Sequence, residues 1–193
     1  MDSEGSAESV VARVLRALAA SGVPYMLTGS FASAFHGAPR TTHDIDIVIH
    51  PTLGTLEALL REFPDDTYYV SRDAALQAYG AEGLFNVIDF ASGWKVDFIV
   101  RKSRPFSVEE FNRRRAVELL GSTLFVASPE DVIISKLEWS KLSESDRQIQ
   151  DAAGILRTQG DVLDFDYIQR WVQSLELVHQ WHDAKVRGGP TGR

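Results

Sequence analysis

The chain has no cysteine, few prolines and no apolar run of the roughly 18 residues that a membrane helix needs. The lack of cysteine excludes disulfides and thiolate metal sites, and it permits a reducing compartment. The first residues also lack a basic leader followed by a long apolar run. We therefore expect a soluble, cytoplasmic protein without a membrane partner.

Positive charge is also scarce, since 20 Lys and Arg stand against 27 Asp and Glu, for a net charge of −7. This balance disfavours broad electrostatic adhesion to nucleic acid. The basic residues nevertheless gather in two places, at Arg101, Lys102 and Arg104 and again at 113–115. Each cluster fits an ordinary solvated surface, and together they only mildly favour a polyanionic partner.

What the chain does contain is a regular alternation of helix and strand patterns over its first 127 residues. The expected helices cover 6–20, 30–37, 53–62 and 74–79, and the expected strands cover 25–27, 44–49, 68–70, 84–90, 94–100 and 123–126. Such alternation predicts an α/β (α+β) fold, with a mixed sheet because the tight turn 91–93 joins two strands.

From Ser128 onward the sequence indicates helices only, at 129–141, 145–158 and 165–186. The first of them opens on Ser128-Pro129-Glu130-Asp131, a serine cap followed by proline at the first helical position. We therefore predict a core at 1–127 that includes the N-terminal helix, a helical subdomain at 128–186, and a flexible tail at 187–193.

Three carboxylates sit in unusually apolar strands. Asp44 and Asp46, in the run DIDIVI, point to the same face of their strand, and Asp97 lies in the run KVDFIV. Converging carboxylates need a compensating cation, and Mg²⁺ is the usual hard cation for carboxylate oxygens. The simpler alternative is that these acids form strand-end ion pairs with Arg40, Lys95 or Arg101.

A glycine-serine turn precedes this strand by 13 residues. Gly29, which has no side chain, lets a phosphate group come close to the backbone. Ser30 is expected to cap the following helix, where its hydroxyl and the free N–H groups of the helix N-terminus could bind that phosphate. By itself such a pair also fits an ordinary turn between a strand and a helix.

In combination, Gly29-Ser30, the Asp44-Ile45-Asp46 strand and the later isolated Asp97 resemble the signature of the nucleotidyltransferase superfamily with the DNA polymerase β-like fold. The resemblance implies that the glycine-serine turn holds a nucleoside triphosphate. It also implies that the three acids bind two Mg²⁺ ions, which stabilise the attacking and leaving oxygens of a phosphoryl displacement.

The helical half extends the resemblance. SPEDVIISKLEWSK and SDRQIQDAAGIL are similar to blocks of compact bacterial nucleotidyltransferases of the abortive-infection and toxin–antitoxin type, so that matching segments run from about residue 24 to 157. The resemblance implies that Lys136 reaches the triphosphate and that Asp151 supports the site.

The residues themselves leave more than one interpretation open. Lys136 falls inside the apolar arc of its helix, where it needs an anionic partner unless its ammonium group reaches solvent along the surface. Asp151 points away from the apolar stripe, as a surface acid would, and Asp146 or Asp151 could pair with Arg147. Arg40 fits either a phosphate contact or a plain loop charge.

The sequence thus predicts an Mg²⁺-dependent nucleotidyltransferase that moves an NMP group from an NTP, ATP among them, to a hydroxyl acceptor and releases pyrophosphate. Metal-binding and catalytic roles are expected at Asp44, Asp46 and Asp97, and triphosphate contacts at Gly29, Ser30, Lys136 and Arg40. The acceptor, a small molecule, tRNA or protein, stays open. The alternative is a non-catalytic relative that binds nucleotide or a partner such as a cognate antitoxin-like protein.

Overall fold

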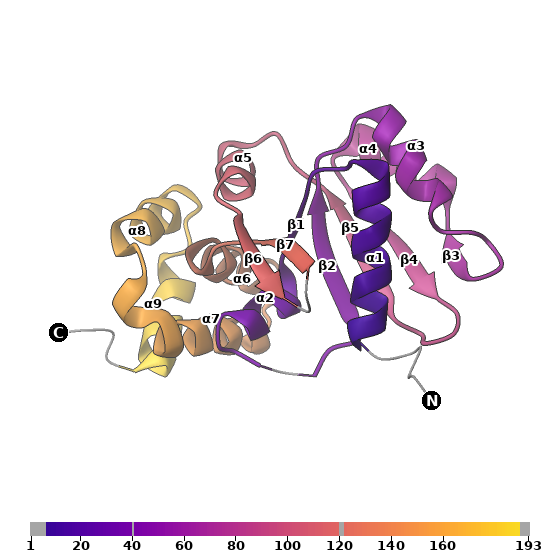
Figure 1. The fold of residues 1–193 in the computed structure, drawn as a ribbon. Helices are drawn as coiled ribbons and strands as arrows, with labels where there is room; N and C mark the ends of the chain where they lie inside the picture. The colour runs from indigo at the N-terminus through magenta and orange to yellow at the C-terminus, as the bar shows by residue number, and fades with distance from the viewer. Residues whose placement is uncertain (1–6, 40, 120–121, 190–193) are drawn as a thin grey trace. The chain divides into compact units, whose positions relative to one another are not determined.

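The computed structural model describes residues 7–39, 41–119 and 122–189, which form two compact units (Figure 1). The first unit contains Met1–Leu27 and Thr42–Val126, and the second contains Thr28–Thr41 and Ala127–Arg193. Arg40 and the last four residues of the predicted tail lie outside the described residues.

The first unit is built on a seven-stranded sheet with the order β3-β4-β5-β2-β1-β7-β6. Its strands are β1 (Tyr25–Leu27), β2 (Asp44–Ile49), β3 (Tyr68–Val70), β4 (Leu84–Asp89), β5 (Lys95–Val100), β6 (Arg115–Leu119) and β7 (Ser122–Val126). The β2/β5 and β1/β7 pairs are parallel and the other pairs are antiparallel. The predicted mixed sheet is therefore confirmed.

One face of this sheet is buried under helices of the same unit, α1 (Ala7–Ser21) and α3 (Leu53–Arg61) among them (Figure 1). Ile45 and Ile47 of β2 and Phe98 of β5 point to this face and are at most 1% exposed. Phe63, just after α3, lies with its ring centroid 5.9 Å from that of Phe98. Each such side chain contributes about 1.5–3 kcal/mol by leaving water.

Two further helices complete this unit, α4 (Arg72–Ala81) and α5 (Pro105–Asn112). The expected helix at 74–79 is thus confirmed and longer at both ends. Helix α5 and strand β6 were not predicted, because α5 is a short helix in which Phe106 and Phe111 are the only buried apolar side chains. Strand β6 starts at Arg115, within a basic cluster whose composition fits a solvated surface rather than a strand.

The second unit is helical and consists of α2 (Gly29–Phe35), α6 (Pro129–Ser143), α7 (Asp146–Gln159), the 3₁₀ turn η1 (Gly160–Val162), α8 (Phe165–Ser174) and α9 (Val178–Gly188). The predicted cap of α6 is confirmed, since the Ser128 hydroxyl accepts the backbone N–H of Asp131 at 3.2 Å. Along the stretches that the structure covers, no helix is long and apolar enough to cross a membrane.

The single helix expected at 165–186 is wrong, because the chain breaks it into α8 and α9. Glu176 adopts the left-handed conformation with φ of 57°, and the backbone N–H of Leu177 donates to the carbonyl of Val172. This is the hydrogen-bond pattern of a helix C-terminus. Apolar periodicity continues through the break, so the pattern by itself did not reveal it.

Candidate active site

The three predicted carboxylates are brought to one face of the sheet in the first unit. Parallel pairing of β2 with β5 sets Asp46 directly opposite Asp97 and Asp44 opposite Lys95. Paired residues on neighbouring strands point the same way, and such strands lie about 4.8 Å apart. The face that carries these side chains is the one turned away from Ile45, Ile47 and Phe98.

The three acids differ in exposure. Asp44 is exposed at the start of β2, Asp46 is half-buried and Asp97 is 8% exposed. Two carboxylates that face each other at this spacing repel unless a positive charge lies near them.

Lys95 supplies that charge. Its ammonium nitrogen lies 3.0 Å from Oδ2 of Asp97 and 3.5 Å from Oδ1 of Asp44. The hydrogen bond to Asp97 is the largest cause that raises the pKa of Lys95 above its ordinary value, and the charges of Asp97 and Asp44 add to it, against the opposing effect of burial. The simpler alternative from the sequence, in which the acids form ion pairs with residues such as Lys95, is therefore observed for Asp44 and Asp97.

Asn86 completes the polar group from the neighbouring strand. It lies opposite Asp97 in the antiparallel β4/β5 register and donates its side-chain amide to Oδ1 of Asp97. Both carboxylate oxygens of Asp97 are thus engaged, one by Asn86 and the other by Lys95. Sequence reasoning did not single out Asn86, because its role depends entirely on which strand pairs with β5.

Whether this group suits a divalent cation depends on its donor atoms. Carboxylate oxygens are the ligands that Mg²⁺ prefers. The Lys95 ammonium, which contacts both Asp44 and Asp97, shows that these two carboxylates attract a positive charge between them. Within the described residues, however, no set of three or more His, Asp or Glu side chains is arranged to hold a metal ion. The donor chemistry fits Mg²⁺, and its binding would require Lys95 to move.

The glycine-serine turn lies in the second unit. Gly29 has φ of 60°, a left-handed conformation that glycine adopts at little cost, and it is the first residue of α2. The expectation that Ser30 caps this helix is wrong. Thr28 occupies the cap, and Ser30 lies one residue inside the helix with 5% exposure.

Lys136 and Asp151 form a buried ion pair that joins α6 to α7. The ammonium nitrogen donates to Oδ2 of Asp151 at 2.8 Å, and the two side chains are 5% and 8% exposed. The expected inward direction of Lys136 is confirmed. The expectation that Asp151 is a surface acid is wrong, because α6 packs against its side of α7.

The suggested pairing of Arg147 with Asp146 or Asp151 is also wrong. Asp146 binds Arg187 at 2.6 Å, which lowers the pKa of Asp146 mainly through that hydrogen bond. Arg147 lies in the first turn of α7, and its side chain has no hydrogen bond or ion pair with another described residue.

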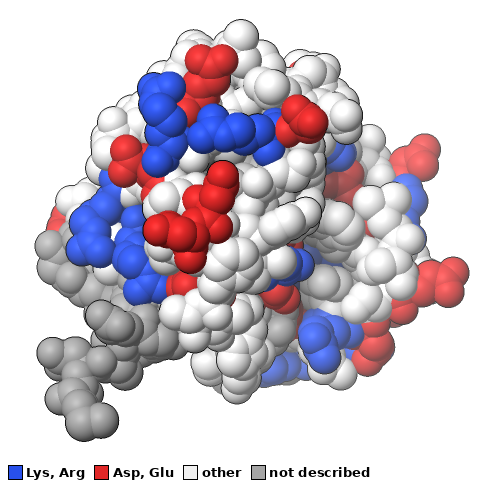
Figure 2. Space-filling model, turned by 90° about the vertical axis from the view of Figure 1, so that its right-hand side faces the viewer, with Lys and Arg blue, Asp and Glu red and all other residues white. Residues whose placement is uncertain are grey.

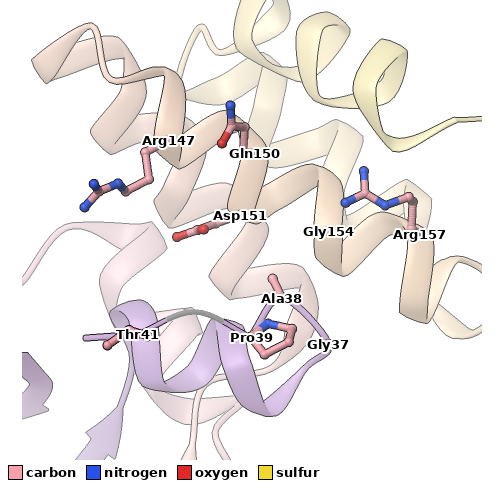
Figure 3. A pocket seen from close by; sticks show the side chains of 9 residues that line it. All are labelled: Gly37, Ala38, Pro39, Thr41, Arg147, Gln150, Asp151, Gly154 and Arg157. Carbon is pink, nitrogen blue, oxygen red and sulfur yellow. The ribbon is translucent and has the colours of Figure 1, made fainter. Parts of the chain in front are cut away.

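Asp151 also lines a cavity of about 450 Å³ within the second unit. The cavity lies between one stripe of α7 and the segment after α2, and its walls are Gly37, Ala38, Pro39, Thr41, Arg147, Gln150, Asp151, Gly154 and Arg157 (Figure 3). Figure 3 shows the Asp151 carboxylate pointing into this space, with Arg147 and Arg157 toward opposite ends. The α7 residues of this cavity are spaced by three and four, which places them on one face of the helix, so the sequence does carry a signal for this wall.

The fold of the chain is similar to that of several solved proteins, whereas no family model and no curated protein matches its sequence. The antibiotic-resistance factor ANT(2'')-Ia, solved in complex with adenylyl-2''-tobramycin, is 12% identical to this chain, with a TM-score of 0.60. The match covers 89% of this chain and 97% of that chain.

Two further solved structures agree with this similarity. A nucleotidyltransferase-like antigen of Paracoccidioides brasiliensis is 16% identical, covers 91% of this chain and 90% of its own, and has a TM-score of 0.55. A candidate nucleotidyltransferase of Thermotoga maritima is 21% identical, covers 72% of this chain and 87% of its own, and has a TM-score of 0.50. The predicted resemblance is confirmed at the level of fold.

Proposed function

We propose that this chain, whose fold is nucleotidyltransferase-like, transfers an NMP group from an NTP to a hydroxyl acceptor and releases pyrophosphate. The observation that carries the proposal is the register of β2 and β5, which sets Asp46 opposite Asp97 and adds Asp44 to the same face. An ordinary structural role explains one acid in such a sheet more readily than three acids on one face.

In this proposal Asp44, Asp46 and Asp97 would hold Mg²⁺, and the bound ion would supply charge stabilisation for the oxygens of the transferred phosphoryl group. Lys95, whose side chain is 39% exposed, would have to leave the carboxylates for the cation to bind there. Asn86 keeps its hydrogen bond to Oδ1 of Asp97 and so holds that carboxylate in a constant orientation.

The reaction forms one bond and breaks one. The acceptor oxygen bonds to the α-phosphorus as the bond between that phosphorus and the α–β bridging oxygen breaks, and the bridging oxygen leaves with pyrophosphate. The proton of the acceptor hydroxyl passes to a carboxylate oxygen. Oδ2 of Asp97 is our choice for this role in the alternative in which Asp44 and Asp46 alone hold the cation, because Oδ1 of Asp97 accepts from Asn86.

Gly29, Ser30 and Lys136 remain our candidates for binding the triphosphate, together with Arg40, which lies outside the described residues. An ammonium group has three N–H donors, and Asp151 accepts one of those of Lys136. The remaining donors suit a phosphate oxygen.

A second candidate function is supported by the same Lys95 contacts. A lysine that neutralises Asp44 and Asp97 is also what a non-catalytic relative would use to stabilise the sheet, leaving a module that binds nucleotide or an antitoxin-like partner. Turnover distinguishes this candidate from the enzyme.

The test is a thermal-shift titration with each of the four NTPs, with and without Mg²⁺. A ligand that binds only the native state at a hundredfold excess over Kd raises stability by about 2.7 kcal/mol. We expect an Mg²⁺-dependent shift that Asp46→Ala removes and that Asp65→Ala keeps, since Asp65 is an exposed loop acid of the same unit. The enzyme proposal fails if no nucleotide shifts the wild-type protein in the presence of Mg²⁺.

The acceptor is sought next, by following pyrophosphate release. ANT(2'')-Ia binds an adenylylated aminoglycoside, so small polyhydroxylated molecules are the first class to test, with tRNA and protein hydroxyls as the others. Pyrophosphate release that depends on an acceptor and on Asp46 supports the enzyme; nucleotide binding without release under any acceptor supports the second candidate. The enzyme would act in the cytoplasm, where NTPs are supplied.

A further inference from the structure

In the first unit, two arginines and a histidine lie near one another at the end of β2 and β5 that is away from the carboxylates. His50 follows the last residue of β2, Arg101 follows the last residue of β5, and Arg114 lies two residues after α5. The carboxylates, by contrast, lie in the first halves of β2 and β5. We call His50, Arg101 and Arg114 the cationic group.

Backbone and ring contacts hold the cationic group in place. The backbone N–H of Arg101 donates to the carbonyl of Ile49 at 2.8 Å, and that of His50 donates to Pro24 at 2.9 Å. The guanidinium of Arg114 donates to the Phe111 carbonyl at 2.6 Å and lies 4.3 Å from the centre of the Phe111 ring. The His50 ring is edge-on to the same ring at 6.0 Å.

Arg101 contacts His50 rather than an acid, and Arg114 lies near enough for its charge to affect His50. A guanidinium nitrogen of Arg101 donates to Nε2 of His50 at 3.0 Å, so that Nε2 carries no proton in this arrangement. No ion pair joins Arg101 or Arg114 to a carboxylate within the described part of the chain. Glu82 is near enough to feel the charge of Arg101, but its carboxylate accepts hydrogen bonds from Ser103.

Two other cations of the same unit are paired with acids. Arg13 pairs with Asp89, and Lys95 pairs with Asp97 and Asp44. Figure 2 likewise shows Lys and Arg side chains interspersed with Asp and Glu over one face of the molecule. Arg101 and Arg114 differ from Arg13 and Lys95 in this respect, because no ion pair joins either of them to a carboxylate of the described residues.

Burial of these two arginines without an acid partner is energetically costly. The Nε atoms of both Arg101 and Arg114 are buried and have no hydrogen-bond partner among the described residues. Burial lowers the pKa of Arg114. Buried donors that lack an acceptor, next to converging like charges, are arranged for an anion that accepts several N–H groups at once.

We propose that His50, Arg101 and Arg114 form a binding site for a phosphate-type oxyanion. Two guanidinium groups and an imidazole match the several acceptor oxygens of a phosphate group, and the Phe111 ring limits how far Arg114 can turn. The phosphate is either free, as inorganic phosphate or pyrophosphate, or part of an RNA backbone. The site does not depend on the proposed transfer reaction.

Histidine protonation makes binding pH-dependent. Burial and the charges of Arg101 and Arg114 lower the pKa of His50, so that the imidazole is neutral at neutral pH. A bound anion offsets both arginine charges and favours the protonated ring. Affinity for sulfate, whose own charge is constant over this range, should rise as the pH falls from about 7.5 to 5.5.

The experiment is a sulfate and phosphate titration of the whole chain, followed by the NMR signals of the arginine Nε–H groups. We expect saturable shifts of Arg101 and Arg114, and an affinity that Arg101→Gln lowers about tenfold or more, since each charge-assisted contact is strong. Lys102→Gln removes one charge from the exposed neighbouring residue and should leave the affinity within about twofold. His50→Gln should remove the pH dependence of sulfate binding.

Fluorescence anisotropy with a short single-stranded RNA then separates the two sources. Binding tighter than that of free phosphate, and lost in Arg101→Gln, identifies an RNA backbone as the source; RNA that binds no more tightly identifies a free anion. The proposal is overturned if neither anion gives a saturable shift, or if Lys102→Gln weakens binding as much as Arg101→Gln does. Melting curves confirm that each variant is folded.

Discussion

Replacing Asp151 with asparagine should destabilise the helical unit more than any exposed charge change. The substitution keeps the size of the side chain but leaves the ammonium of Lys136, which is 5% exposed and 2.8 Å from Asp151, without a counter-charge. Removing one partner of a buried pair costs about 3–5 kcal/mol. For a chain of this length such a loss lowers the melting midpoint by roughly 6–20 °C.

The assay is urea and thermal denaturation followed by far-ultraviolet circular dichroism. Glu176→Gln is the matched control, because Glu176 forms an exposed ion pair with Lys141 and such pairs contribute little. The double variant Lys136→Met with Asp151→Leu buries no charge and should recover much of the loss. The reasoning is refuted if Asp151→Asn shifts the midpoint no more than Glu176→Gln.

Two further predictions concern other parts of the chain. Gly154→Ala should destabilise the protein, because the new methyl group would lie 2.8 Å from Cβ of Ala38. Gly80→Ala, with nothing within 4 Å of the new methyl group, should instead stabilise its helix by about 0.5–1 kcal/mol. Denaturation experiments in which both substitutions change the stability in the same direction would contradict this. The pKa of His50 is lower in the folded protein than the ordinary 6.5, so the folded state binds fewer protons than the unfolded state and stability is lost as the pH falls below about 6.5. In buffers without multivalent anions, the melting midpoint should fall less between about pH 8 and 5 for His50→Gln than for the wild type. Equal decreases of the melting midpoint would count against a lowered pKa of His50.

Local pattern carried much of the fold prediction. The period-two runs DIDIVI and KVDFIV identified β2 and β5, and the Ser128 cap identified the start of α6. These features depend on neighbours within a few residues, so the sequence is sufficient to find them. Where the local signal was short, as in α5, or continued across a break, as at Glu176, the prediction failed.

The candidate site divides in the same way. The sequence by itself determined that Asp44 and Asp46 share a face, that Asp97 lies in an apolar strand, and that Lys136 points inward. Only the tertiary structure decided that Asp46 lies opposite Asp97 and that Lys95 bridges two of the acids. Strand register between segments about 50 residues apart is set by packing of the whole core, which no local window contains.

The same physical reason applies to the cationic and helical residues. His50, Arg101 and Arg114 belong to three separate segments, and they meet because β5 pairs with β2 and α5 returns the chain to the end of that pair. Asp151 is buried because α6 covers its side of α7 and presents Lys136 to it. A helical wheel describes one helix alone, so it cannot show which face a neighbouring helix covers.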